Sequence, residues 1–260
     1  NAIVPDDAAS SKRVAFGNCN LLDRTPADTQ HEIINMDGFR AMLFGNKPAT
    51  AEQSGKQDPN VAFYKGEIAS QPHGDFVDAI HEKWDGDFQR LEMHHGYIQW
   101  LFPVFENAGM NFESAPLSKE GAAIIRDDAT CCQRVLKSYR LMLKFYGLRL
   151  EDEKTGEVGR HESCYEAQMD NFNFSGHNFL RISRIITSLG ELGFQRYKKP
   201  LIERLKTEVE CGALANGRDS CYRFWEPLVT GENEEWYARK TREEPADRAQ
   251  LLGTAVGSSS

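Results

Sequence analysis

Apolar side chains recur at helical spacing along much of the chain, and this spacing predicts a helical protein. From Asp127 to Tyr146 they follow an i, i+3, i+4, i+7 pattern, and Gly147 is a suitable stop. The members of this stripe are Cys132, Val135, Leu136, Tyr139, Met142, Leu143 and Tyr146. Leu141 and Phe145 lie off the stripe, so we expect this central helix to be buried on more than one side.

Shorter patterns predict further helices around the central one. Asp58 followed by Pro59 is a cap and first-turn signal, and Asp75 is a plausible cap for the apolar run that follows it. Other helical patterns cover about Thr29–Leu43, Ser175–Leu189 and Tyr197–Val209. The segment from Leu148 to Val158 suits a small hairpin or a surface loop. The predicted fold class is all-α, an irregular multi-helix globular domain with at most one small β-hairpin.

Changes in composition along the chain predict its domain organisation. Residues 1–57 contain prolines and little periodicity, and are interpreted as a poorly packed N-terminal arm. The helical domain is expected over residues 58–211. Residues 212–240 carry aromatic side chains among many charges and are expected to form a partly ordered C-terminal extension. Residues 241–260 have little to bury and are predicted to be a disordered tail.

Composition narrows the classes of function. The 260 residues are 40% hydrophobic and 27% charged, which is typical of a soluble globular protein. The net charge of −8 disfavours nucleic acid and anionic lipid as partners. The longest nearly apolar stretch, from Tyr97 to Phe105, is too short to span a membrane. The six cysteines show no CxxC pair and are interpreted as reduced thiols, which favours an intracellular location.

No motif predicts catalysis. His81–Glu82 and His161–Glu162 each lack the second histidine of an HExxH zinc helix, and no phosphate-binding glycine loop occurs. His81 and Glu82 would form a metal site with His94 and His95 only if the two segments faced each other, so capping or hydrogen-bonded histidines are the alternative. We therefore expect no catalytic residues, no metal and no cofactor.

An aromatic segment is the densest unusual feature of the sequence. HHGYIQWLFPVF, from His94 to Phe105, combines Tyr97 and Trp100 with polar groups and a proline. One interpretation is a wedge in the core between helices. The other is an aromatic wall of a peptide groove, because Tyr and Trp combine a large contact area with a polar group.

A short zwitterionic peptide would also need charged partners. Arg181 and Arg184 lie one turn apart and would bind its carboxylate, and Asp85 or Asp87 would bind its amine. The alternatives for the arginines are a solvated face or buried pairing with Glu166 or Glu191. The candidate peptide-binding residues are therefore His94, His95, Tyr97, Trp100, His177, Asn178, Arg181 and Arg184.

Four segments, in one order, resemble a known family. They are IHEKWDGDFQRLEMHHGYIQWLFP (80–103), GMNFESAPL (109–117), SYRLMLKFYGLRLEDEKTGEV (138–158) and HNFLRISRIITSLGELGFQRYKKPL (177–201). Together they resemble the conserved domain of the opioid growth factor receptor family over about residues 61–209. The resemblance implies a non-catalytic, mainly helical protein that recognises a short peptide, methionine-enkephalin in the family, in growth regulation. It also implies a nuclear or perinuclear and cytoplasmic location with peripheral association with the nuclear envelope.

Three hypotheses about function follow. The first is a binding module for a short peptide or a protein partner. The second is a metal-dependent enzyme that uses His81, Glu82, His94 and His95, which the metal content of purified protein would distinguish. The third is a structural interaction scaffold, which predicts no small-ligand pocket.

Overall fold

The computed structural model describes residues 57–106, 111 and 113–230. The chain divides into two units, residues 1–35 and 36–260, and all the described residues belong to the second unit. The predicted helix at Thr29–Leu43, most of the predicted N-terminal arm and the predicted tail at 241–260 lie outside the described residues.

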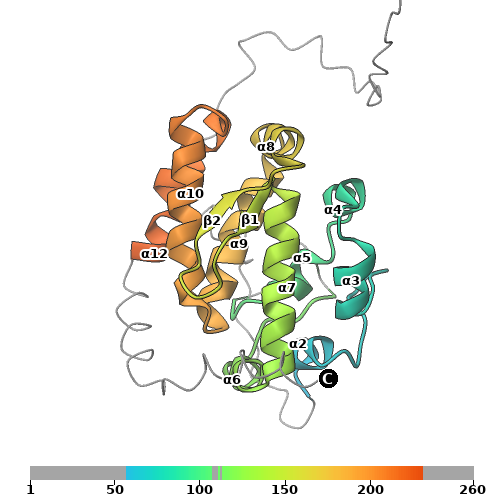
Figure 1. The fold of residues 1–260 in the computed structure, drawn as a ribbon. Helices are drawn as coiled ribbons and strands as arrows, with labels where there is room; N and C mark the ends of the chain where they lie inside the picture. The colour runs from blue at the N-terminus through green and yellow to red at the C-terminus, as the bar shows by residue number, and fades with distance from the viewer. Residues whose placement is uncertain (1–56, 107–110, 112, 231–260) are drawn as a thin grey trace, which may run out of the picture. The chain divides into compact units, whose positions relative to one another are not determined.

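Helices dominate the described part of the chain (Figure 1), which confirms the predicted fold class. The α-helices are α2 (Pro59–Tyr64), α3 (Val77–Lys83), α4 (Phe88–Met93), α5 (Ile98–Leu101), α6 (Lys119–Asp127), α7 (Ala129–Phe145), α8 (Tyr165–Phe174), α9 (His177–Glu191), α10 (Lys198–Glu210), α11 (Arg218–Ser220) and α12 (Pro227–Thr230). Single turns of other helix types occupy Gln195–Tyr197, Ala215–Gly217 and Cys221–Trp225. The two strands, β1 (Leu148–Leu150) and β2 (Val158–Arg160), form an antiparallel hairpin.

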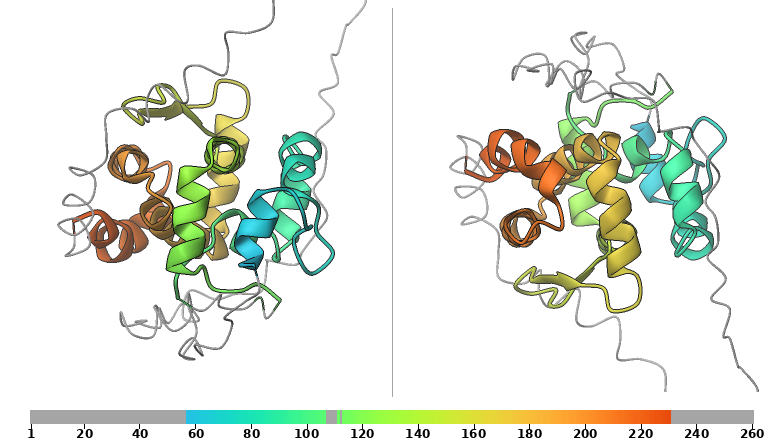
Figure 2. Two further views of the ribbon diagram at one scale, coloured as in Figure 1. Left: turned by 90° about the horizontal axis from the view of Figure 1, so that it is seen from below. Right: turned by 90° about the horizontal axis from the view of Figure 1, so that it is seen from above.

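Helix α7 lies at the centre of this unit, as its apolar stripe predicted. Figure 2 shows α2–α5 on one side of it and α10–α12 on the other. Val135 and Tyr139, on the stripe, are at most 1% exposed, and the off-stripe residues Leu141 and Phe145 are at most 5% exposed. The prediction that α7 is buried on more than one side is confirmed. In its first turn Cys131 is buried, whereas Cys132, the first residue of the predicted stripe, is half-buried.

The starts of two helices show where short signals are sufficient and where they are not. Asp58 caps α2 by accepting a hydrogen bond from the Asn60 N–H at 2.8 Å, as predicted. The prediction that Asp75 caps α3 is wrong, because the N-cap residue is Phe76 and has no side-chain cap. The Asp75 carboxylate instead accepts hydrogen bonds from Trp84 Nε1 and Arg90, at 3.0 and 3.1 Å. A buried indole N–H needs an acceptor, and Asp75 supplies it.

Gly147 ends α7 and starts the hairpin. Its φ of +75° is favourable for glycine, and a Cβ there would lie 2.8 Å from the Tyr165 carbonyl oxygen. The following residue, Leu148, pairs with Arg160 across the hairpin, which confirms a hairpin as the predicted structure after α7. Glycine at this position therefore lets the chain turn directly from the central helix into β1.

The packed core continues past Cys211. Leu214, Cys221 and Trp225 are fully buried. The Trp225 Nε1 donates a hydrogen bond to the Phe179 carbonyl at 3.1 Å, and the Trp225 ring stacks on that of Phe172. Residues 212–230 thus cover one side of α9.

Candidate functional site

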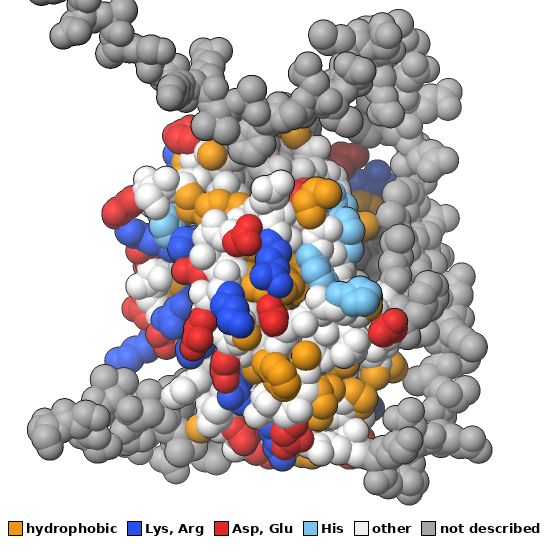
Figure 3. All heavy atoms as spheres, turned by 90° about the vertical axis from the view of Figure 1, so that its right-hand side faces the viewer, with side chains coloured by type: hydrophobic (Ala, Val, Ile, Leu, Met, Phe, Trp, Pro, Cys, Tyr) orange, Lys and Arg blue, Asp and Glu red, His pale blue; other side chains and the backbone are white. Residues whose placement is uncertain are grey.

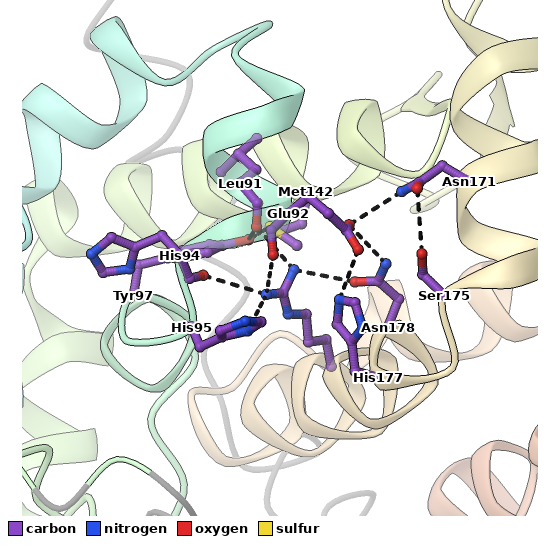
Figure 4. Close-up of polar contacts among 11 residues, drawn as sticks. Leu91, Glu92, His94, His95, Tyr97, Met142, Asn171, Ser175, His177 and Asn178 are labelled. Carbon is purple, nitrogen blue, oxygen red and sulfur yellow. Dashed lines mark hydrogen bonds and ion pairs between the residues drawn. The ribbon is translucent and has the colours of Figure 1, made fainter. Parts of the chain in front are cut away.

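The C-terminal end of α4 meets the N-terminal part of α9 through a group of polar side chains, which we call the α4–α9 cluster (Figure 4). Its members are Glu92, His95, Asn171, His177, Asn178 and Arg181. Helix α4 ends at Met93, and His94 has an extended backbone. The last carbonyl groups of the helix therefore lack intrahelical donors and need other partners.

Arg181 of α9 supplies these partners. Its Nη1 donates to the Leu91 carbonyl at 3.0 Å, and its Nη2 donates to the carbonyls of Glu92 and His94 at 3.2 and 3.3 Å. The Tyr97 hydroxyl also donates to the Leu91 carbonyl, at 3.0 Å. The Arg181 residue is only 5% exposed. The N–H groups of its planar guanidinium are directed at these carbonyls. Its role is to dock the end of α4 on α9.

Glu92 is the carboxylate of the cluster. Its Oε1 lies 2.9 Å from His177 Nε2, and its Oε2 accepts hydrogen bonds from the side-chain amides of Asn171 and Asn178 at 3.2 and 3.1 Å. Burial by itself would raise the pKa of Glu92, but the hydrogen bonds from these three side chains outweigh it and lower the pKa to about 2. Glu92 is therefore ionised at neutral pH while its side chain stays 20% exposed.

The neighbouring histidines are weak cations. Burial lowers the pKa of both His94 and His95, and the charge of Arg181 adds to this effect. The His95 ring packs edge-on against the His177 ring with the ring centres 5.8 Å apart. Both of these rings reach the surface, and Figure 3 shows histidine side chains gathered at the upper right of that view.

The structure brings together most, but not all, of the residues predicted to bind a peptide. His94, His95, His177, Asn178 and Arg181 are in or next to the α4–α9 cluster. Tyr97 lies beneath it and is fully buried. Its placement in the core agrees with the interpretation of this aromatic segment as a core wedge.

Trp100 and Arg184 lie in the core away from the cluster. The Trp100 residue is 2% exposed, and its Nε1 donates to the Gln71 carbonyl at 2.8 Å. The Arg184 Nε donates to the Phe102 carbonyl at 2.7 Å, and burial, opposed by the charge of Glu191, lowers the pKa of Arg184 to about 10. Neither side chain reaches a surface ligand in this arrangement.

The histidines and carboxylate proposed for a metal do not converge. His81 Nε2 lies 2.9 Å from Ser138 Oγ, and burial lowers the pKa of His81 to about 4. Within the part of the chain that the structure describes, no three His, Cys, Asp or Glu side chains are placed to hold a metal ion.

The two carboxylates predicted to bind a peptide amine are also engaged elsewhere. Asp85 pairs with Lys144 at 2.9 Å, and Asp87 caps α4 by accepting from the Arg90 N–H at 3.1 Å. The acidic residue of the cluster is Glu92, which was not among the residues predicted from the sequence. Its place two residues before the His94–His95 pair is the signal that could have identified it.

Two large apolar side chains on the helices that build the cluster are exposed. Met93 directly follows Glu92 and is 70% exposed. Phe174 lies one turn beyond Asn171, a donor to Glu92, and is 73% exposed. Single exposed apolar residues are common, but these two lie close in sequence to Glu92 and to its hydrogen-bond donor Asn171. The helices that build the cluster thus carry both a fixed negative charge and exposed apolar side chains.

The fold and the cluster define a mainly helical domain whose polar site is held together by side-chain contacts between remote segments. This domain belongs to the opioid growth factor receptor family, because the model of the opioid growth factor receptor conserved region matches residues 53–235. The resemblance drawn from the four sequence segments is confirmed.

Individual relatives agree with this assignment. The chain is 41% identical to the human opioid growth factor receptor over 158 residues, which are 60% of this chain and 23% of the human protein. It is 41% identical over 144 residues to the mouse opioid growth factor receptor-like protein 1, covering 55% of this chain and 30% of that protein. The chain therefore spans about a quarter to a third of the curated relatives it matches. These relatives are named as a receptor and a receptor-like protein.

No solved structure matches this chain. Among the helices that the structure describes, none has the length and apolar character needed to cross a membrane.

Replacing Glu92 with glutamine is expected to lower the free energy of unfolding at pH 7 by about 1–2 kcal/mol, a range that allows for partial solvent screening. The folded-state pKa of about 2 lies below the ordinary value of 4.5, so the stabilisation is present above about pH 4.5 and is lost as the pH falls toward 2. Urea unfolding of both proteins between pH 3 and pH 7 measures this difference.

The control for this prediction is Glu203→Gln, because the Glu203 side chain is 63% exposed and lies 3.9 Å from Lys199. It should change the free energy of unfolding by less than about 0.5 kcal/mol at any pH. A Glu92→Gln effect that stayed constant down to pH 3 would contradict the assigned role of the carboxylate charge.

Proposed function

We propose that this domain is a non-catalytic binding module that recognises a short peptide, or a protein partner presenting such a segment, in growth regulation. The human relative is named an opioid growth factor receptor. The observation that carries the proposal is the ionised, solvent-accessible Glu92, together with the exposed Met93 and Phe174 on the helices that build the cluster.

The carboxylate has the properties that recognition of a peptide amine requires. Glu92 keeps its negative charge at neutral pH, and His177 and two amides hold its side chain in place. An ammonium group that approaches it forms a charge-assisted hydrogen bond with a preorganised acceptor, which limits the entropy lost on binding. Asp85 pairs with Lys144 and Asp87 caps α4, so both serve contacts outside the cluster.

The apolar side chains supply the remaining contact area. Met adapts to irregular partners, and aromatic rings are frequent anchors of peptide interfaces. Of the predicted peptide-binding residues, His95 and His177 are exposed and would contact the peptide directly. The other members of the set would support the exposed residues from beneath the surface; they are His94, Tyr97, Asn178 and Arg181. Trp100 and Arg184 support the core further away.

Isothermal titration with methionine-enkephalin tests the proposal, with its N-acetylated form and a scrambled peptide as controls. We expect saturable binding that weakens at least about tenfold when acetylation removes the amine charge. Phe174→Ala and Glu92→Gln should each weaken binding by a similar factor. The matched control is Ile124→Ala, an exposed apolar residue of α6 at 45% exposure, which should leave affinity unchanged.

Two results would overturn the proposal. One is the absence of heat at peptide concentrations of about 1 mM, and the other is equal binding of the native and scrambled peptides.

A nuclear or perinuclear and cytoplasmic location, with peripheral association with the nuclear envelope, is part of the same proposal. Its support is membership of the family. Imaging of the tagged full-length protein tests it, and a signal confined to another compartment would contradict it.

A further inference from the structure

A cavity of about 400 Å³ lies between α3, α7 and β1. None of these elements contributes a residue to the α4–α9 cluster. This volume is in the range of small-molecule sites in proteins. Polar and apolar groups both line the cavity, so it suits a ligand with a charged end and a hydrocarbon part. The scaffold hypothesis predicted no such pocket.

Four cationic side chains line the cavity, although the whole chain carries a net charge of −8. Lys137, Arg140 and Lys144 follow one face of α7 at i, i+3 and i+7, and Arg149 comes from β1. Burial lowers the pKa of His81 to about 4, so this residue is neutral and adds no charge at physiological pH. Lysine and arginine therefore set the positive character of this wall.

Most of these cations have only solvent-exposed acidic partners. Lys144 pairs with Asp85, Arg140 with Glu153, and Arg149 with Glu151 and Glu162. Exposed ion pairs of this kind are worth about 0–1 kcal/mol, so a multiply charged anion can take their place.

Lys137 differs from the other three cations. It is exposed, and within the described ranges its ammonium group forms no hydrogen bond or ion pair. Glu82 and Asp85 are the carboxylates that line the cavity itself, and Asp85 already pairs with Lys144. Lys137 is thus the cation most available to a ligand.

Leucine side chains form the apolar part of the lining. Leu141 is 5% exposed, Leu148 is fully buried, and Leu150 is half-buried against the core. They come from the same two elements as the cations. A ligand with an apolar group next to an anionic group would therefore contact the leucines and the cations at the same time.

The geometry points to a binding site for an organic phosphate, with the phosphate on Lys137 and Arg140 and the hydrocarbon part on Leu141 and Leu150. A phosphate monoester carries close to two negative charges and three acceptor oxygens. It therefore suits a lysine and an arginine one turn apart better than a carboxylate ligand, which carries one charge and two oxygens. This inference is independent of the peptide-binding proposal, because the two sites share no residue.

Phenyl phosphate is the probe for this inference, with inorganic phosphate and phenol as the two halves of the ligand. Titration calorimetry and amide chemical-shift mapping should show one saturable site with a Kd at or below about 1 mM. The shifts should centre on residues 137–150. Inorganic phosphate should bind at least about tenfold more weakly, and phenol should not bind, because each lacks one of the two contacts.

The variants Lys137→Gln and Arg140→Gln should each weaken phenyl phosphate binding about tenfold, and Lys199→Gln should leave it unchanged. Lys199 is a suitable control because its side chain is 72% exposed on α10, outside the cavity. Binding should also weaken as the salt concentration rises.

The inference is overturned if phenyl phosphate gives no saturable binding, or if Lys137→Gln and Lys199→Gln behave alike. It is also overturned if the shifts lie elsewhere on the folded protein. Spectra of each variant before titration show that the fold is intact, so lost binding cannot be mistaken for unfolding.

Discussion

Replacing Arg181 with methionine is expected to lower the free energy of unfolding by about 3–5 kcal/mol. Methionine keeps the apolar stem of the side chain but donates no hydrogen bonds. The carbonyls of Glu92 and His94 would then lose their Arg181 donor, and the Leu91 carbonyl would keep only the Tyr97 hydroxyl. Each buried acceptor left without a partner costs about 1–3 kcal/mol.

Urea unfolding measured by circular dichroism tests this expectation, with the slope of the transition checked for constancy. Arg181→Lys should fall between wild type and Arg181→Met, because one ammonium cannot reproduce a planar fork that reaches three carbonyls. Arg223→Met is the matched control. The Arg223 side chain is 49% exposed and lies 3.9 Å from Asp219, so its loss should cost less than about 0.5 kcal/mol.

A loss below about 1 kcal/mol for Arg181→Met would show that the end of α4 does not depend on this contact. The large expected effect also explains why Arg181 is unsuitable as a probe of ligand binding. A variant at this position would weaken any peptide interaction by displacing the whole α4–α9 cluster.

Replacing Glu208 with glutamine should have the second large effect, a loss of about 3 kcal/mol in the free energy of unfolding. The Glu208 residue is fully buried on α10. It accepts two hydrogen bonds from Arg160, at 3.0 and 2.8 Å, and one from the Tyr165 hydroxyl at 2.7 Å. Arg204 pairs with it from the preceding turn at 2.6 Å.

The charge of Glu208 is essential to this arrangement. Burial by itself would raise the pKa of Glu208, but the contacts with Arg160 and Tyr165 outweigh it and lower the pKa. Its contribution to stability is therefore present at neutral pH and is lost as the pH falls below the ordinary range for a glutamate. Glutamine fills the same space but leaves two arginines without a negative partner.

Glu203→Gln is again the control, since it lies on the same helix with an exposed side chain. Thermal and urea unfolding of the three proteins at pH 7 and pH 3 measure the effect. If Glu208→Gln and Glu203→Gln had equal stability at pH 7, the role of Glu208 as the anchor between the β-hairpin and α10 would be wrong.

Local sequence signals were sufficient for much of the fold. The apolar stripe of α7, the Asp58 cap and the glycine stop at Gly147 each act through neighbours a few residues away. Such interactions depend on backbone geometry and spacing that can be counted along the chain. The helical class and the hairpin could therefore be predicted without any knowledge of tertiary contacts.

The positions of the charged residues could not be predicted in this way. Arg181 and Arg184 have the spacing of an exposed helix face, yet both are buried, because carbonyl groups from the segment around α4 and α5 accept their hydrogen bonds. The partner of Arg181 at Leu91 is 90 residues away in the sequence. No local pattern encodes a contact of that separation.

The sequence by itself determined the helical class, the central helix, the hairpin and the family. Only the tertiary structure decided which candidate residues are accessible, because Glu92 and His177 reach solvent while Tyr97 and Trp100 do not. The physical reason is that periodicity reports which face of an element is apolar. Whether a charged side chain can be buried depends on which distant backbone groups the fold brings within hydrogen-bond distance, because these replace its lost hydration.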